Sequence, residues 1–198
     1  MPRLGALGAN ALHIALLADA ASKAAAISEQ ATAYAFATGG KFPENLLPAS
    51  LKRKSQRGIG LGERLHHAFQ TLLRLHSRTV VIGADSPELS PARLRQAFRE
   101  LAIVDAVLGP CPDGGYYLIG LRRFDPTIFE GVRWGSRFAF RDTLDNLVRL
   151  GFSCSIIEEI ADIDRPADYD RLARAMRTRP QLRRLAPAAW RFIRSIRE

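Results

Sequence analysis

Carboxylates follow three apolar runs of the 198-residue chain, and each lies in a segment rich in glycine or proline. Asp85 belongs to GADSPEL, Asp113 to GPCPDGGYY, and Asp162 and Asp164 to the triplet Asp-Ile-Asp. Open α/β sheets bind ligands outside the carboxyl ends of their strands. Carboxylate oxygens suit hard divalent cations, which can bridge to phosphates. The pattern therefore predicts a metal and phosphate site built from these acids.

Each acidic segment also has a purely structural interpretation. Asp85 can cap a turn before a proline, and the glycines after Asp113 are typical of a tight turn between strands. Residues 162–164 precede Arg-Pro and can form a helix N-terminus. Tyr116 and Tyr117 point to opposite faces of a strand, so at most one of them can line the same pocket. Both interpretations of each acid stay open at this point.

Periodicity predicts the elements that would position these acids. Apolar stripes and capping signals indicate helices at 7–26, 61–73, 90–102, 138–150 and 168–176, and β-branched or aromatic runs indicate strands at 32–38, 51–55, 78–83, 105–109, 116–121 and 153–157. Strands without polar alternation are typical of parallel sheets buried on both faces. We therefore predict a single-domain α/β fold with a mostly parallel sheet and helices on both faces.

The net charge of +9 is concentrated at the C-terminus. Residues 171–198 hold nine arginines and one acid, a net of +8, so the other 170 residues carry only +1. This distribution predicts a domain over 1–176, a basic extension over 177–198, and no general nucleic-acid surface. The extension has an amphipathic pattern, which favours either weak contact with a membrane surface or packing on the domain.

Cysteine usage and hydropathy suggest the compartment. Cys111 and Cys154 provide neither a disulfide framework nor a metal-ligand spacing, and no apolar run approaches the ~20 residues that span a bilayer. No signal-peptide pattern begins the sequence. We therefore expect a cytoplasmic protein.

The order of the motifs is more specific than any one of them. GADSPEL, GPCPDGGYYLIGL, FEGVRWGS and DIDRPADYDRL together resemble bacterial glycosyltransferase-like proteins of the arsenosugar-biosynthesis group, in the nucleotide-diphospho-sugar transferase superfamily. The resemblance covers residues 3–176 and implies a GT-A-like fold. It also implies a Mg²⁺ or Mn²⁺ ion held by Asp85 and Asp164, with Asp162 as the alternative to Asp164.

The same resemblance implies a substrate and roles for further residues. It assigns Arg3, Gly83, Gly114, Gly115 and Tyr116 to binding of a nucleotide-sugar and an unidentified small-molecule acceptor. Asp113 becomes the candidate general base on the acceptor hydroxyl. A metal-dependent transferase is therefore expected. The alternatives are a nucleotidyltransferase similar to molybdenum-cofactor guanylyltransferases, or a non-catalytic binding protein. A homodimer is also expected, because a sheet edge would be exposed.

The sequence departs from the family at three places, one of which is the arginine that follows Ser136 where the family tends to have threonine. The family opens with a strand and a phosphate-binding loop, whereas the match here begins only at Arg3, and Gly60 stands where the family has an aspartate. A missing central strand would leave a gap in the sheet with unpaired backbone groups. These departures predict either a true start further upstream or a shortened relative that no longer handles nucleotides.

Overall fold

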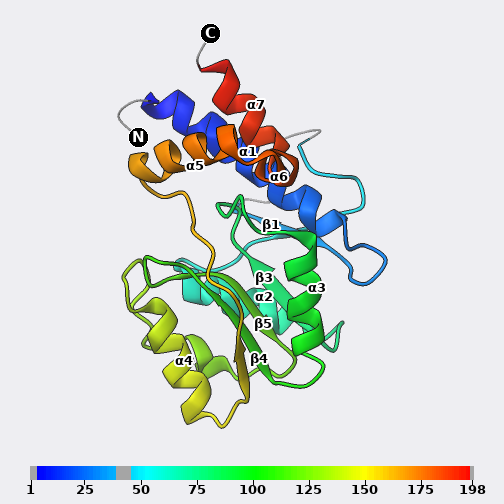
Figure 1. Ribbon diagram of the computed structural model, residues 1–198. Coiled ribbons are helices and arrows are strands. Elements are labelled where there is room, and N and C mark those ends of the chain that lie inside the picture. Colours follow the sequence, from blue (N-terminus) through cyan, green and yellow to red (C-terminus); the bar gives the residue numbers. More distant parts are fainter. Residues whose placement is uncertain (1–3, 39–45, 197–198) are drawn as a thin grey trace.

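The computed structural model describes residues 4–38 and 46–196, so the predicted ligand-binding Arg3 lies outside the described residues. The elements follow one another in the order α1 (Gly5–Ala25), β1 (Tyr34–Ala37), β2 (Lys52–Ser55), α2 (Leu61–Leu72), β3 (Thr79–Ile82), α3 (Pro91–Glu100), β4 (Ala106–Pro110), β5 (Tyr116–Leu121), η2 (Pro126–Phe129), α4 (Ala139–Arg149), β6 (Cys154–Ile156), α5 (Pro166–Thr178), α6 (Pro180–Leu185) and α7 (Pro187–Ser195). This succession of strands and helices confirms the α/β class (Figure 1).

The larger sheet is mixed, and the expectation of a mostly parallel sheet is wrong. Its strand order is β3-β5-β4-β6, in which β5 runs antiparallel to both β3 and β4, and β4 runs parallel to β6. The physical reason is the short connection between β4 and β5. A parallel pair needs a crossover of a dozen or more residues, whereas a five-residue turn can join only antiparallel neighbours.

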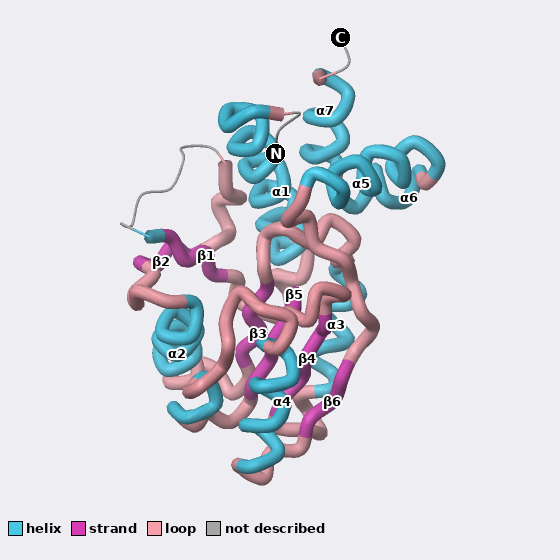
Figure 2. The backbone as a smooth tube through the Cα atoms, turned by 90° about the vertical axis from the view of Figure 1, so that its left-hand side faces the viewer, coloured by secondary structure: helices cyan, strands magenta, loops and turns pink. Residues whose placement is uncertain are grey.

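Strands β1 and β2 form a separate two-stranded parallel sheet. Figure 2 shows this pair beside α2 and apart from the four strands β3 to β6. One edge of β1 therefore has no strand partner within the described residues, and neither does the edge of β3 opposite β5. The division of strands matches the gap that the sequence led us to expect.

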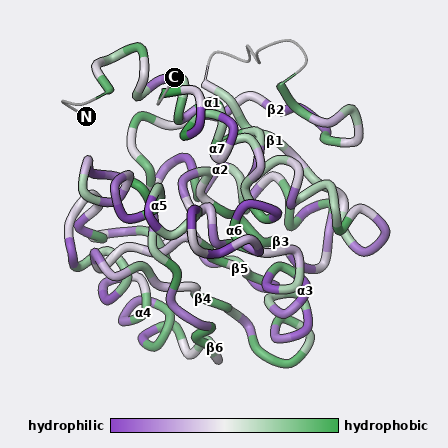
Figure 3. The backbone as a smooth tube through the Cα atoms, turned by 45° about the horizontal axis from the view of Figure 1, so that its top comes forward, coloured by the Kyte–Doolittle hydropathy of each residue, from purple (hydrophilic) through white to green (hydrophobic). Residues whose placement is uncertain are grey.

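Helices cover both faces of the larger sheet, as predicted. On one face α3 contributes Leu94 and Ala97 to a buried cluster, while on the other α2 and α4 contribute Phe69 and Leu147 to a second cluster. Figure 3 shows hydrophobic and hydrophilic residues alternating along α4, as an amphipathic helix requires. The Ser90 hydroxyl accepts a hydrogen bond from the Arg93 backbone at 3.2 Å, which confirms the N-cap that the sequence predicts for α3.

The C-terminal helices pack on α1 and form a third buried cluster. Ala189 and Ile193 of α7 lie buried with Leu12 and Leu16 of α1 (Figure 1). The apolar side of α7 is thereby occupied by the protein itself, which supports packing on the body of the molecule over membrane contact through that side. No helix in the described residues is long and apolar enough to cross a bilayer.

A buried carboxylate joins α1 to the start of α7. Both oxygens of Asp19, whose side chain is almost fully buried, accept hydrogen bonds of 2.9 Å, one from the backbone N–H of Ala188 and one from that of Ala189. These N–H groups belong to the first turn of α7 and have no partner within the helix. Burial raises the pKa of Asp19, and the two backbone bonds and Lys23 oppose that rise.

We predict that Asp19→Ala lowers the free energy of unfolding by about 1–3 kcal/mol, because it leaves one buried and one half-buried donor without acceptors. Urea denaturation followed by circular dichroism measures this loss. Asp145→Ala is the matched control, since Asp145 forms only an exposed ion pair with Arg141 on α4 and should change stability by less than about 0.5 kcal/mol. Equal losses in the two variants would show that Asp19 does not hold α7.

Candidate functional site

Three strands of the larger sheet deliver the predicted acids to one edge. Strands β3, β4 and β6 run in the same direction, because β5 is antiparallel to β3 and β4, and β4 is parallel to β6. Asp85 follows β3, Asp113 follows β4, and Asp162 and Asp164 follow β6. The shared direction places the loops at the carboxyl ends, where open sheets bind ligands.

The turn after β4 depends on glycine. Gly114 has a φ of +88°, and a Cβ at this position would lie 2.1 Å from the backbone oxygen of Arg137. No residue with a side chain fits there without displacing backbone. The Asp113 carboxylate accepts a hydrogen bond of 2.8 Å from the Gly115 backbone N–H. The tight-turn interpretation of this segment is thus correct, and the turn also fixes the direction of Asp113.

A buried lysine on α1 holds the loop that follows β3. Lys23 of α1 donates to the backbone oxygens of Pro87 at 2.9 Å and Ser86 at 3.5 Å. Burial lowers the pKa of Lys23 to about 8, and Asp19 opposes that fall. A Cβ on Gly83 would lie 2.6 Å from Oδ1 of Asp85, so glycine leaves room for the carboxylate to fold back over the strand end.

Lys23 was missed by sequence reasoning, although a signal was present. Asp19 and Lys23 are four residues apart in an alanine-rich helix, on a face that is otherwise apolar. Opposite charges at this spacing are neighbours on a helix, and charged residues are rarely fully buried unless they are paired. The sequence could therefore have identified Asp19 and Lys23 as a buried pair that connects α1 to other segments of the protein.

The segment after β6 runs beside β4 and carries the last acids into the site. Its path is fixed by the backbone bond from Ile160 N–H to Pro110 oxygen, at 3.1 Å. As a result, ligand atoms of Cys111, Asp113 and Asp162 all lie within 4.8 Å of one another. Cys111 is a further residue of the site that the sequence did not assign to it.

The closeness of the acids, together with their burial, shifts the pKa values of two of them. Burial first, and then repulsion from Asp113, Asp164 and Asp85, raises the pKa of Asp162 to about 6. The pKa of Asp164 is raised as well, by burial and then by Asp85, Asp113 and Asp168. A cation bound beside Asp162 and Asp164 would offset this repulsion and stabilise their charged forms.

Cys111 is buried in the same group and carries no thiolate at neutral pH. Desolvation and the neighbouring acids, Asp162 foremost, raise the pKa of its thiol. Because the thiolate is the nucleophilic form, the arrangement supports a protonated, passive cysteine.

The two tyrosines after the turn lie on opposite faces of β5. Tyr116 packs edge-on against Trp134, with ring centroids 6.2 Å apart, and burial raises the pKa of its phenol. Tyr117 packs in the cluster under α3, and its hydroxyl donates to the Glu158 backbone oxygen at 2.9 Å. The structure therefore gathers Gly83, Gly114, Gly115 and the four aspartates around one edge, but buries much of Tyr116 between β5 and the core under α2 and α4.

A cleft of about 1120 Å³ reaches from the acids into the molecule, with Asp85, Cys111 and Asp162 in its wall. An enclosed void of that size would cost about 27 kcal/mol at ~24 cal/mol per Å³. This exceeds the ~5–15 kcal/mol by which a domain is stable. Solvent or a ligand must therefore fill the cleft. Its volume also exceeds the ~300–1,000 Å³ of an ordinary small-molecule pocket.

We predict that Asp162→Asn changes how stability depends on pH. The pKa of Asp162 is about 6 in the folded protein, above the ~3.9 of an unfolded chain. The folded state therefore binds the proton more tightly, so this group's contribution to stability is present below about pH 4 and lost as the pH rises to about 6. Melting in EDTA between pH 4 and 7 should show the variant gaining stability relative to the wild type as the pH rises. An unchanged difference, like that expected for Asp145→Asn, would contradict the clustering.

Comparisons with known proteins agree with this architecture. A crystal structure from Desulfovibrio desulfuricans G20, named as a "putative nucleotide-diphospho-sugar transferase", superposes with a TM-score of 0.82 at 28% identity, over 96% of this chain and 87% of that one. None of the curated proteins matches the chain. The sequence profile of a family described as "Uncharacterized protein conserved in bacteria (DUF2064)" matches residues 12–136, more than half of the chain. The chain therefore belongs to the DUF2064 family.

Proposed function

We propose that this protein is a metal-dependent transferase that uses a nucleotide-activated sugar, on a GT-A-like fold of the type implied by the arsenosugar-group resemblance. The observation that carries the proposal is that the loops bearing Asp85, Asp113, Asp162 and Asp164 all follow strands that end at one edge of the sheet, where ligand atoms of Cys111, Asp113 and Asp162 lie within 4.8 Å of one another. The similarity to a protein named as a nucleotide-diphospho-sugar transferase supports the substrate class.

We infer that Asp85 and Asp164, with Asp162 as the alternative to Asp164, would hold a Mg²⁺ or Mn²⁺ ion. Carboxylate oxygens are the ligands that both ions accept. Burial, and then repulsion from the neighbouring acids, raises the pKa values of Asp162 and Asp164, and a divalent cation would relieve that repulsion. When bound, such an ion stabilises negative charge on a departing nucleotide diphosphate.

The remaining residues position the substrates. Gly83, Gly114 and Gly115 let protein groups pack closely at the site, because the side-chain positions of Gly83 and Gly115 are taken by the carboxylates of Asp85 and Asp113 and that of Gly114 by the Arg137 backbone. We assign these three glycines to the substrate-binding loops. The hydrogen bond from Gly115 holds the Asp113 carboxylate in one orientation. We assign Asp113 the role of the general base that accepts a proton from the acceptor hydroxyl, with the acceptor bound over the β4–β5 turn.

Thermal melting with ligands tests the proposal. The melting temperature is measured with Mn²⁺ or Mg²⁺ against nucleotide-sugars and nucleoside triphosphates, for the wild type, Asp85→Asn and the exposed control Asp145→Asn. A ligand at a hundredfold excess over Kd adds ~2.7 kcal/mol of stability, which at this size raises the melting temperature by roughly 5–10 °C. We expect a metal-dependent rise with a nucleotide-sugar in the wild type and in Asp145→Asn, and its loss in Asp85→Asn.

The other outcomes separate the alternatives. A rise with triphosphates alone would favour nucleotidyl transfer on the same fold. A cooperative melt with no rise for any nucleotide would overturn the proposal and leave a non-catalytic binding protein, in keeping with the divided sheet.

A further inference from the structure

Asp19 and Lys23 form a buried pair of opposite charges on one face of α1. Their exposed fractions are 2% and 5%, and among the described residues they are the only buried acid and the only buried base. Residues four apart on a helix are neighbours, one turn from each other. A charge that is removed from water needs a compensating charge or hydrogen bonds. Each of these two residues therefore depends on the other for its charge compensation in the interior.

The two members of the pair bond different segments of the protein. The Asp19 carboxylate accepts its two hydrogen bonds from the first turn of α7. The Lys23 ammonium donates to the backbone oxygens of Ser86 and Pro87, directly after Asp85. One turn of α1 thus joins the start of a C-terminal helix to residues 83–89, which we call the Asp85 loop.

The hold of Lys23 on the Asp85 loop depends on the charge of Asp19. Burial lowers the pKa of Lys23 to about 8, and Asp19 opposes that fall. Without the carboxylate, the cost of burying the ammonium is no longer offset, so Lys23 gives up its proton or turns towards solvent. Either change weakens its bonds to the loop, because hydrogen bonds from a charged donor are stronger than those from a neutral one.

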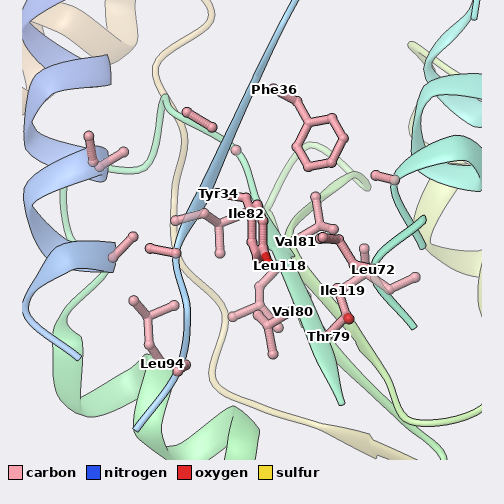
Figure 4. Close-up of a pocket in the computed structure, with 18 of the residues that line it drawn as sticks. Tyr34, Phe36, Leu72, Thr79, Val80, Val81, Ile82, Leu94, Leu118 and Ile119 are labelled. Carbon is pink, nitrogen blue, oxygen red and sulfur yellow. The ribbon is translucent and has the colours of Figure 1, made fainter. Parts of the chain in front are cut away.

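The pair lies outside the cleft between β1 and β3. Helix α1 contributes Leu17 to the wall of that cleft, and Figure 4 shows Ile82 and Leu94 in the same wall. Neither Asp19 nor Lys23 belongs to the residues that line it. The contacts that join α7 to the Asp85 loop therefore do not involve the contents of the cleft.

We propose that Lys23 is a positioning residue for Asp85, and that its hold on the Asp85 loop is coupled through Asp19 to the docking of α7. While α7 is docked, its first turn fixes the Asp19 carboxylate beside Lys23, and Lys23 fixes the loop. When α7 separates, the loop gains freedom and Asp85 is less often oriented to bind a cation. Only this last effect rests on the proposed function, because the coupling between α7 and the loop is a property of the fold.

Amide hydrogen exchange by NMR, on the full 198-residue chain without metal, tests the coupling. The reporter in the loop is the Leu89 N–H, which bonds to the Ser86 oxygen at 3.2 Å, and the reporter on α7 is the Ala189 N–H. Asp19→Asn removes the charge and keeps the size of the side chain. We expect exchange about tenfold faster at Ala189 and also at Leu89, to which Asp19 makes no hydrogen bond. Because coupling is reciprocal, Lys23→Met should speed exchange at both reporters as well.

The double variant Asp19→Asn/Lys23→Met separates coupling from two independent losses. With both charges removed, neither is left buried alone, so exchange at Leu89 should be no faster than in Lys23→Met. Asn146→Ala is the matched control. It removes two hydrogen bonds to the backbone oxygens of residues 128 and 130, on the opposite face of the sheet, and should leave both reporters unchanged relative to the amides of β5.

The affinity for Mn²⁺, measured by paramagnetic broadening, tests the positioning role. We expect it to be about tenfold weaker in Asp19→Asn and in Lys23→Met, and unchanged in Asn146→Ala. Equal affinity in all three variants would overturn the positioning role. Unchanged exchange at Leu89 in Asp19→Asn, or effects that add in the double variant, would overturn the coupling. A wild type that binds no Mn²⁺ would overturn the proposed metal site, and the exchange rates would still decide the coupling.

Discussion

The common direction of β3, β4 and β6 is the constraint on which the rest of this structure depends. Because each strand ends at the same edge, residues more than seventy positions apart in the chain enter one small volume. The local devices are modest: a glycine with positive φ after β4, and a backbone bond that guides the segment after β6. The shared direction of the strands brings the acidic loops to one edge of the sheet, and the conformation of each turn determines where its carboxylate points.

That meeting point is electrostatically unfavourable without a ligand. Asp162 and Asp164 have raised pKa values because they are partly buried next to other acids. On the other side of the site, helix α1 connects two segments of the protein: Asp19 caps α7, and Lys23, one turn later, bonds the loop that carries Asp85. The C-terminal helices are thus connected to the site through α1. Carboxylates whose pKa values are shifted by burial and by neighbouring acids are characteristic of functional sites.

The sequence predicted the elements and the acids well, because both follow local rules. Apolar periodicity located the helices and strands, and carboxylates that follow apolar strands indicated the site. Strand direction was predicted less well: the short glycine turn between 110 and 116 already required an antiparallel β5, but the apolar character of the strands was given more weight. The spacing of Asp19 and Lys23 on an apolar helix face indicates a buried pair, but the segments that the pair contacts, and the inclusion of Cys111 in the site, depend on distant parts of the chain that no local pattern encodes. The gap beside β3 was expected from the resemblance, but its apolar lining could be known only from the packing.

Binding of a divalent cation by Asp85 and Asp164, with Asp162 as the alternative to Asp164, is the central claim, and a titration of Mn²⁺ followed by amide NMR tests it most directly. The paramagnetic ion broadens the signals of nearby residues. The account predicts saturable broadening centred on Asp85, Asp113 and residues 162–164, reversed by excess Mg²⁺. Broadening that never saturates, or that centres on exposed acids such as Asp145, would contradict a metal site at this edge.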